Sequence, residues 1–333
     1  MSQVFAPTPA EYTLLRTDAG VVDRSDRLRM TFTGDKAADT LTGLVTSDVL
    51  ALQAGHGQFA AALTPKGRVL ADVRVFRRTS GEFLIDLPRA AADGFAAMVR
   101  KYVNPKFAKY TDVSASLACI GVVGPHARQV VAHALSCSPA AFDMLPPFAN
   151  TDMPFGGDTV LIARSVDYGV DGFDCFVAAN STPALHDALV RSGAAPAANA
   201  ALETLRIEAG RPAYGVDMSE DTLLHEAILD TLDAVSYTKG CYTGQEVVAR
   251  LHFRGHVNKL LRGLVLSAPA TPGATVIAAD AEVGDVRSCA LSPRLGAIAL
   301  AMVRREVEPG SSVTVRTDVG DVPATLIALP FPA

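Results

Sequence analysis

From Lys259 to its end, the chain carries only strand patterns, and glycine or proline separates them at short intervals. Strands this short and this closely spaced are typical of antiparallel barrels or sandwiches, because no stretch is left over for crossover helices. Residues 258–333 therefore predict a unit of their own, a small antiparallel β-barrel. The residues that separate its strands are Pro269, Pro272, Gly273, Gly284, Pro293, Gly296, Pro309, Gly310 and Gly320.

The first 115 residues mix strand and helix patterns. Residues 28–32 alternate apolar and polar side chains, which predicts a strand. Residues 58–63 and 69–76 are apolar runs joined by Thr-Pro-Lys-Gly, which indicates a hairpin. A further strand is expected at 82–87. The helical patterns of this part cover residues 36–44 and 90–103.

A second unit is predicted over residues 116–195. Its elements follow the order β-α-β-β-α, which suits a small ferredoxin-like α+β fold. Residues 136–157 form a long, proline-rich stretch between the first helix and the second strand of this unit, and we expect an irregular excursion of the chain over the surface there. A helix follows at 202–209. Residues 210–256 then show little regular pattern, and such a stretch in a compact chain is usually functional.

Several function classes lose support on composition and motifs. The chain has no GxGxxG, GxxxxGK[ST] or GxSxG motif and no HExxH zinc site. Its five cysteines include no CxxC pair, which favours reduced thiols over disulfides or a metal centre, and we expect no resident metal. The net charge of −5 excludes a basic surface over the whole molecule. No targeting segment or long apolar stretch is evident, so we expect a soluble cytoplasmic protein without membrane contact.

The most informative segment is KGCYTGQE, residues 239–246. Two glycines frame Cys241 and Tyr242 and let the backbone approach a ligand closely. Lys239 stands two positions before the thiol, and a nearby ammonium favours the nucleophilic thiolate. A solvated turn with an incidental thiol is the alternative interpretation.

The same segment opens a basic stretch. Between Lys239 and Arg262 the chain has five cations and a single acid, Glu246, although its total charge is −5. A positive stretch of this kind in an acidic protein indicates an anionic partner. Acids from elsewhere in the fold would be the simpler explanation.

KGCYTGQE and the residues that follow it resemble the signature of the YgfZ-type folate-binding proteins, which maintain iron–sulfur proteins and are related to the glycine-cleavage T-protein, an aminomethyltransferase. The resemblance covers nearly the whole chain. Residues 19–49 are similar to the opening of this superfamily, and 164–174 (RSVDYGVDGFD) are similar to a segment of the T-protein's middle domain. Residues 205–210 (LRIEAG) are similar to the family's LRxExG helix end.

This resemblance implies an α+β fold of three domains around a central channel that holds tetrahydrofolate. The folate-binding domain would comprise residues 1–115 and 196–257. The ferredoxin-like domain would cover 116–195, and the barrel 258–333.

The resemblance also implies individual residues of the site. Glu208, in LRIEAG, matches the family glutamate that binds the pterin, and a carboxylate can accept two adjacent pterin N–H groups. Glu226 is a second candidate carboxylate for the channel. The loop around Cys241 would add further folate-site residues, namely Lys239, Gly240, Tyr242, Gln245 and Arg254.

Two residues are the candidates for chemistry. Asp72, in GRVLADVRV, matches the T-protein's catalytic aspartate, which orients the folate and positions the amine. Cys241 matches the cysteine that the YgfZ-type branch requires. A single cysteine does not hold an iron–sulfur cluster, so transient contact or bridging in a dimer would be its role.

From these features we expect a tetrahydrofolate-binding protein, rather than an enzyme, that supports assembly or repair of iron–sulfur proteins and through them tRNA modification. Its partners would be folate and iron–sulfur client proteins. The first alternative is a folate-dependent aminomethyltransferase or demethylase of a small amine, which Asp72 favours. The second is a tRNA- or RNA-interaction module built on the basic stretch, which we rank last because the chain is acidic.

Overall fold

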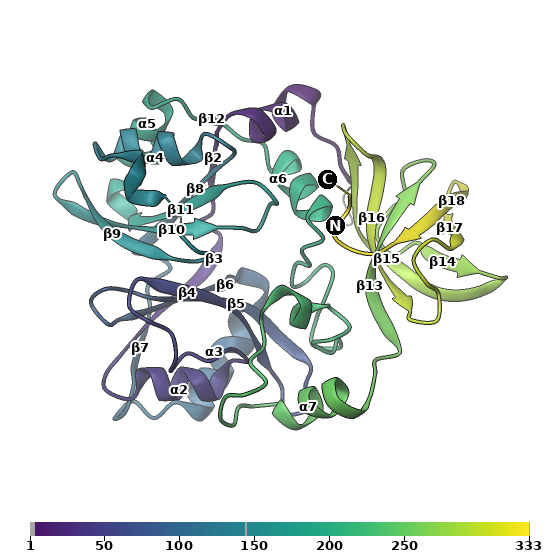
Figure 1. Cartoon of the computed structure of the whole chain (residues 1–333), viewed down its shortest axis with the longest axis horizontal. Coiled ribbons are helices and arrows are strands. Elements are labelled where there is room, and N and C mark those ends of the chain that lie inside the picture. The colour runs from purple at the N-terminus through teal and green to yellow at the C-terminus, as the bar shows by residue number, and fades with distance from the viewer. Residues whose placement is uncertain (1–3, 144, 333) are drawn as a thin grey trace.

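The computed structural model describes residues 4–143 and 145–332. Its strands form three sheets of five, six and seven strands, and the last of these closes into a barrel. In Figure 1 the first two sheets lie one above the other at the left, and the barrel lies at the right. Helix α6 (Asn199–Glu208) lies between these two sheets and the barrel. The mixed α/β content and the C-terminal barrel confirm the predicted fold class.

The five-stranded sheet is antiparallel and has the order β4-β5-β6-β3-β7. The predicted hairpin joins β4 and β5, and Gly67 adopts the positive φ of 73° that its turn requires. Helices α2 and α3 pack on one face through a buried apolar cluster. The strands are β3 (Arg27–Thr33), β4 (His56–Leu63), β5 (Val69–Arg77), β6 (Phe83–Pro88) and β7 (Lys109–Asp112). The helices are α2 (Ala37–Leu44), α3 (Ala92–Tyr102) and the short 3-10 helix η1 (Arg89–Ala91), and η denotes 3-10 helices throughout.

The six-stranded sheet has the order β12-β2-β8-β11-β10-β9. Helices α4 and α5 pack on one of its faces through a second apolar cluster. The bounds are β2 (Gly20–Asp23), β8 (Leu117–Val123), β9 (Asn150–Phe155), β10 (Asp158–Ser165), β11 (Gly172–Ala178), β12 (Ala195–Pro196), α4 (Ala127–Ala134), η2 (Pro139–Phe142), η3 (Ala179–Ser181) and α5 (Thr182–Arg191).

The expectation of an irregular excursion over residues 136–157 is wrong for two parts of it, residues 139–142, which form η2, and residues 150–155, which form β9. Phe142 in η2 is buried in the core of this unit, and β9 pairs with β10 along its whole length. β9 is an edge strand, where Pro154 is tolerated because its missing N–H costs no ladder hydrogen bond. Strand β2 also joins this sheet, although its residues fall in the predicted folate-binding domain. The domain boundaries themselves stay a prediction.

The two sheets face one another through their uncovered sides. Side chains alternate along β5, so Val73 and Val75 point towards α3 while Arg74 and Phe76 point towards the six-stranded sheet. There Phe76 meets Phe176 of β11, with ring centroids 5.6 Å apart. The apolar part of this interface forms a third buried cluster. This cluster holds the two sheets together beside the charged residues described in the next subsection.

The barrel closes because β15 pairs with both β14 and β16. Its order is β15-β14-β17-β18-β13-β16, and β1 (Val4–Phe5) adds to β15 in parallel. Inward side chains form a core of their own. The bounds are β13 (Lys259–Leu266), β14 (Thr275–Ala278), β15 (Ala281–Ser292), β16 (Gly296–Arg304), β17 (Ser312–Thr317) and β18 (Gly320–Ile327).

The remaining helices connect these three units. α1 (Pro9–Thr17) begins with a capping box between Thr8 and Glu11 and packs on α6. The stretch 210–256, expected to have little regular structure, contains η4 (Leu229–Leu232) and a ten-residue helix, α7 (Gln245–Arg254). In the described part of the chain no helix is long and apolar enough to cross a membrane. The cytoplasmic location stays a prediction.

Candidate functional site

A cavity of about 170 Å³ lies where the two facing sheets meet α6 and the segment that follows it. Strands β4, β5 and β6 form one side, the loop after β10 another, and α6 with residues 211–214 the third. Eight of the fifteen residues of its lining are charged. It consists of Arg24, Arg27, Phe59, Asp72, Arg74, Pro88, Asp167, Tyr168, Glu203, Arg206, Arg211, Pro212, Ala213, Tyr214 and Leu232.

Asp72 reaches this cavity from β5. It is two residues before Arg74 and therefore lies on the same face of the strand, towards the six-stranded sheet. Its carboxyl oxygen Oδ1 is buried and has no hydrogen-bond partner among the described residues. Burial raises the pKa of Asp72 to about 6, although Arg27 and Arg74 act in the opposite direction. A buried carboxyl with a free acceptor atom and a pKa near neutrality is typical of functional sites.

Arg74 joins the two sheets beneath Asp72. Its Nη2 lies 2.6 Å from Oδ1 of Asp86 on β6, within its own sheet. Its Nη1 donates to Oδ2 of Asp174 on β11 and lies 3.4 Å from Oδ2 of Asp167. Arg24 also pairs with both of these aspartates, at 3.1 and 3.2 Å. Because every one of these charges has an opposite partner, the network can remain ionised while it is buried.

Asp167 shows the effect of this network. Burial alone would raise its pKa, but Arg74, Arg24 and Arg211 together hold the pKa of Asp167 below its usual range. Asp72 and Asp167 thus line one cavity with their pKa values shifted in opposite directions. Such a pair separates a group that can exchange a proton near neutrality from one that stays ionised.

Helix α6 supplies Glu203 and Arg206, which lie three residues apart and so share a helix face. Arg206 Nε donates to Glu203 Oε2 at 2.9 Å, and its Nη1 donates to Asp217 Oδ2 at 2.8 Å. The aromatic rings of Phe59, Tyr168 and Tyr214 complete the walls. Carboxylates that accept hydrogen bonds, together with flat apolar surfaces, are the groups that bind a heterocyclic ring.

Glu208 does not line this cavity. It lies five residues beyond Glu203 and points to another side of α6, where its carboxylate is buried. It accepts hydrogen bonds from the hydroxyls of Tyr12 and Ser292, and Arg294 Nη2 lies 3.3 Å from Oε2. The carboxylate therefore ties α6 to α1 and to the end of β15.

Glu226 also lies outside the cavity lining. Its Oε2 accepts a hydrogen bond from the backbone N–H of Leu223 at 2.8 Å, which closes a local turn. Its backbone carbonyl accepts from the N–H of Leu261 at the start of the barrel.

Lys239 is buried. Its Nζ donates to the backbone carbonyls of Val45 at 2.6 Å and Ser47 at 2.9 Å, and also to that of Thr42. These carbonyls surround the end of α2, where an ammonium group is favoured by the helix dipole. Burial lowers the pKa of Lys239 to about 8. The first cation of the basic stretch is therefore held inside the protein and is not part of its surface.

The rest of the loop is arranged around this lysine. Nζ of Lys239 lies 4.6 Å from the ring centroid of Tyr242, which is buried. Gly244 has a φ of 86° and precedes α7, and a Cβ there would lie 2.7 Å from the carbonyl oxygen of Thr64. The loop and the start of α7 are thus packed against the β4–β5 turn.

The remaining predicted residues lie at the surface of this loop. Cys241 is an exposed free thiol, Gly240 and Arg254 are exposed, and Gln245 begins α7 at a half-buried position. None of these residues, and neither Lys239 nor Tyr242, lines the cavity. Of all the residues proposed from the sequence, Asp72 alone does so.

The cavity residues that sequence reasoning missed lie in segments that it had identified. Asp167 and Tyr168 belong to RSVDYGVDGFD, and Glu203 and Arg206 lie in or beside LRIEAG. Only the packing of the strands and of α6 reveals which of their side chains meet.

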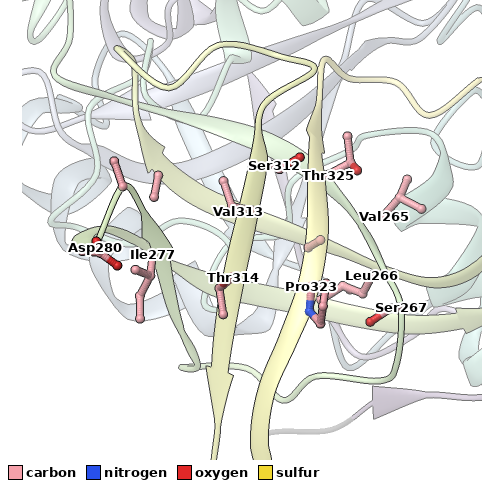
Figure 2. Close-up of a pocket in the computed structure, with 13 residues that line it drawn as sticks. Val265, Leu266, Ser267, Ile277, Asp280, Ser312, Val313, Thr314, Pro323 and Thr325 are labelled. Atoms are coloured by element: carbon pink, nitrogen blue, oxygen red, sulfur yellow. The ribbon is translucent and has the colours of Figure 1, made fainter.

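A larger hollow of about 600 Å³ lies on the outside of the barrel, between β13, β14, β17 and β18. Figure 2 shows its walls, where Ile277, Val313 and Pro323 alternate with small hydroxyl side chains. Asp280 is the only charged residue of its described lining. Despite its smaller volume, the cavity between the sheets is therefore the better candidate for a site that carries out chemistry.

Comparisons with known proteins agree with this architecture. Residues 1–237 match the family model described as the GCVT N-terminal domain, and residues 259–332 match the glycine cleavage T-protein C-terminal barrel domain. An aminomethyltransferase of Rubrobacter xylanophilus is 32% identical over 330 residues, covering 98% of this chain and 87% of that protein. One from Saccharopolyspora erythraea is 31% identical, covering 97% and 89%.

A solved structure shows the same fold. The glycine cleavage system aminomethyltransferase T from Bartonella henselae superposes with a TM-score of 0.87 at 22% identity. The match covers 97% of this chain and 89% of that one.

Proposed function

Because the chain belongs to the glycine cleavage T-protein family, we propose that it is a tetrahydrofolate-dependent enzyme of the aminomethyltransferase type that acts on a small amine. The observation that carries this proposal is the carboxyl group of Asp72, which lines the cavity between the sheets and whose buried Oδ1 has no partner among the described residues. The curated relatives favour this enzymatic reading over the iron–sulfur role expected from KGCYTGQE.

The lining of the cavity is compatible with the ring of tetrahydrofolate. Glu203 offers a carboxylate acceptor for ring N–H groups, and Phe59 and Tyr168 offer flat apolar faces. A volume of about 170 Å³ is small beside the roughly 300–1,000 Å³ of typical ligand pockets, so most of a folate would extend beyond this cavity. When bound, tetrahydrofolate supplies a ring nitrogen that accepts the one-carbon unit.

The chain's own residues would then bind and orient the amine and move its proton. With a pKa of about 6, Asp72 is mostly ionised at neutral pH and can accept a hydrogen bond or a proton from an ammonium group at Oδ1. Arg74 and Arg24 hold Asp167 ionised beside it. With a ligand bound, the aromatic walls would exclude water from these electrostatic contacts and so strengthen them.

Two measurements test this function. Calorimetric titration with tetrahydrofolate should show binding to the intact protein. Coupled assays should show either methylene-tetrahydrofolate formed from an aminomethyl donor, with release of the amine, or methyl-tetrahydrofolate formed from a methylamine, with release of the demethylated amine. Asp72→Asn should lose turnover by about 100-fold or more, as expected for a positioned acid–base group. Asp280→Asn, in the barrel hollow, is the matched control. Failure of the intact protein to bind the folate would contradict the proposal.

A second candidate keeps the iron–sulfur role and rests on one observation. Cys241 is an exposed thiol on a loop that Lys239 and Tyr242 anchor in the core, an arrangement that presents the sulfur to a client protein. If this role is correct, Cys241→Ala should fail to restore iron–sulfur enzyme activity in a deficient strain, whereas Asp72→Asn should restore it. The opposite pattern would favour the transferase.

The RNA-binding alternative is weaker than the sequence suggested. Lys239, one of the five cations of the basic stretch, is bound to three backbone carbonyls and does not reach the surface. RNA binding by the remaining cations would weaken steeply with salt, and its absence at low salt would rule out this alternative.

A further inference from the structure

Arg211 is the cavity arginine that enters from the end of α6. The helix stops there because Gly210 adopts a φ of 66°, and a Cβ at Gly210 would lie 2.9 Å from that of Leu329. The backbone of Arg211 is then fixed from both sides by Arg206. Its N–H donates to the carbonyl of Arg206 at 3.1 Å, and its own carbonyl accepts from Arg206 Nη1 at 2.6 Å. These contacts fix the backbone from which the Arg211 side chain enters the cavity lining.

The guanidinium of Arg211 differs from those of the other arginines that line the cavity. Arg24, Arg27, Arg74 and Arg206 each pair with at least one carboxylate. The guanidinium of Arg211 makes no hydrogen bond or contact ion pair with any described residue, although its charge helps to lower the pKa of Asp167. It lies instead over the ring of Phe59, 5.9 Å from the centroid. Arg211 is also half-buried, so water supplies only part of the hydrogen bonding that its five donors require.

A free, oriented guanidinium in a polar cavity is a binding group for a planar anion. Its forked donors match the two oxygens of a carboxylate, and no described residue accepts a hydrogen bond from them. Asp72 lines the same cavity, and its carboxyl group, whose Oδ1 has no partner among the described residues, can accept from a cation or an N–H donor. The two residues thus present complementary charges to one small ligand.

We propose that Arg211 binds the carboxylate of the amine substrate, and that the substrate is therefore an N-substituted amino acid rather than a simple amine. Its amino group would lie at Asp72 and its carboxylate at Arg211. This inference rests on the proposed function. A glutamyl tail of folate carries the same chemical group, but a cavity of about 170 Å³ does not hold both the ring and the tail of a folate, which favours the smaller ligand.

The test follows transfer of an N-methyl group to tetrahydrofolate, in which the departing amine takes up the proton displaced from the folate nitrogen, and it compares substrates with and without the carboxylate. N-Methylglycine and N-methyl-L-alanine are paired with dimethylamine and N-methylethylamine, which lack only that group. In Arg211→Met, which keeps an unbranched side chain over Phe59, KM for the two amino acids should rise by about 10- to 100-fold, as expected for loss of a hydrogen bond between charged groups. Activity with the two simple amines should remain within about threefold of the unmodified protein.

Two controls identify the source of the carboxylate. Arg305→Met removes an exposed arginine outside the cavity and should leave KM for both amino acids unchanged. Tetrahydropteroate, which lacks the glutamyl group, is compared with tetrahydrofolate by calorimetry. If Arg211→Met weakens tetrahydrofolate and leaves tetrahydropteroate unaffected, Arg211 binds the glutamyl tail and the proposal is overturned. An equal loss of activity with all four amines would overturn it as well.

The two proposals can fail separately. If the protein turns over none of these amines, direct titration of N-methylglycine into the intact protein and into Arg211→Met decides the matter. Binding that is lost in the variant would retain the carboxylate site while the transferase function fails. Absence of binding to the intact protein would overturn the site.

Discussion

The hydroxyl of Tyr12 lies 3.0 Å from Oε1 and 2.9 Å from Oε2 of Glu208, although 196 residues separate the two in the chain. Ser292 and Arg294 contact the same carboxylate from the barrel side. Glu208 therefore connects the first helix, the central helix and the barrel. Each oxygen of its carboxylate already has protein partners, which leaves it occupied within the fold.

We predict that Glu208→Ala lowers stability more than it lowers folate affinity. Removal of the carboxylate leaves the buried Tyr12 hydroxyl and Arg294 without their acceptor, at a cost of about 2–4 kcal/mol in the free energy of unfolding. Glu203→Ala, on the cavity face of the same helix, should weaken tetrahydrofolate binding instead. Urea denaturation and calorimetric titration of both variants measure the two effects.

The reverse result would restore Glu208 as the pterin ligand that the family resemblance implies. In that case the folded state would lose little free energy in Glu208→Ala, and the tetrahydrofolate affinity of this variant would fall by tenfold or more. Tyr12→Phe provides a milder check, because it removes one donor and leaves the carboxylate in place.

The raised pKa of Asp72 predicts how the stability of the protein depends on pH. Its pKa is raised to about 6 in the folded protein from a usual value of 3.8, so the folded state holds this proton more tightly than the unfolded chain does. Its contribution to stability is fully present below pH 3.8 and is lost as pH rises through 6. At 1.36 kcal/mol for each pKa unit, the loss amounts to at most about 3 kcal/mol.

Asp72→Asn should therefore stabilise the protein at pH 7.5 by about 1–3 kcal/mol and leave it nearly unchanged at pH 4. Denaturation of both proteins across this range gives the difference curve, whose midpoint should lie between pH 3.8 and 6. A difference that is constant with pH would show that the raised pKa is not a property of Asp72. Together with lost turnover, the predicted curve would indicate that stability is given up at this position for function.

The elements found and missed from the sequence differ in how many of their side chains are buried. Strands such as β5 and β6 are correctly predicted, because most of their side chains are buried and the apolar pattern is continuous. Helix α7 is missed because Val248 is its one fully buried residue, so no apolar stripe marks it. Strand β9 is missed because an edge strand with a proline carries little alternation.

The site could be located from the sequence only to the level of segments. Most residues of α6 are buried, Glu208 among them, and burial alone gives no sign that Glu203 and Arg206 face the cavity. Only the contacts of each side chain show that Glu208 joins parts of the fold whereas Glu203 and Arg206 line the cavity. Lys239 illustrates the same limit, since its sequence neighbours suggested a thiol activator and its contacts are three backbone carbonyls.

The ion network beneath the cavity should be more sensitive to the loss of one member than to neutral replacement of a pair. We predict that Arg74→Met destabilises the protein by about 3–5 kcal/mol, because Asp86 and Asp174 are both buried and lose a counter-charge. Adding Asp174→Asn to Arg74→Met should recover part of this loss. A double-mutant cycle measured by chemical denaturation tests it, and strict additivity would contradict the coupling.

Lys239 provides the last prediction. Lys239→Met preserves most of the aliphatic stem but leaves the carbonyls of Thr42, Val45 and Ser47 without their shared donor, so the free energy of unfolding should fall by about 3–5 kcal/mol. Lys259→Met, at an exposed position of the same basic stretch, should change it by less than about 0.5 kcal/mol. Hydrogen exchange should also quicken in residues 238–245 of the first variant, because the anchor of the loop at the end of α2 is lost. If both variants unfold alike, Lys239 contributes only surface charge, and the exposed thiol of Cys241 is not held in place by this anchor.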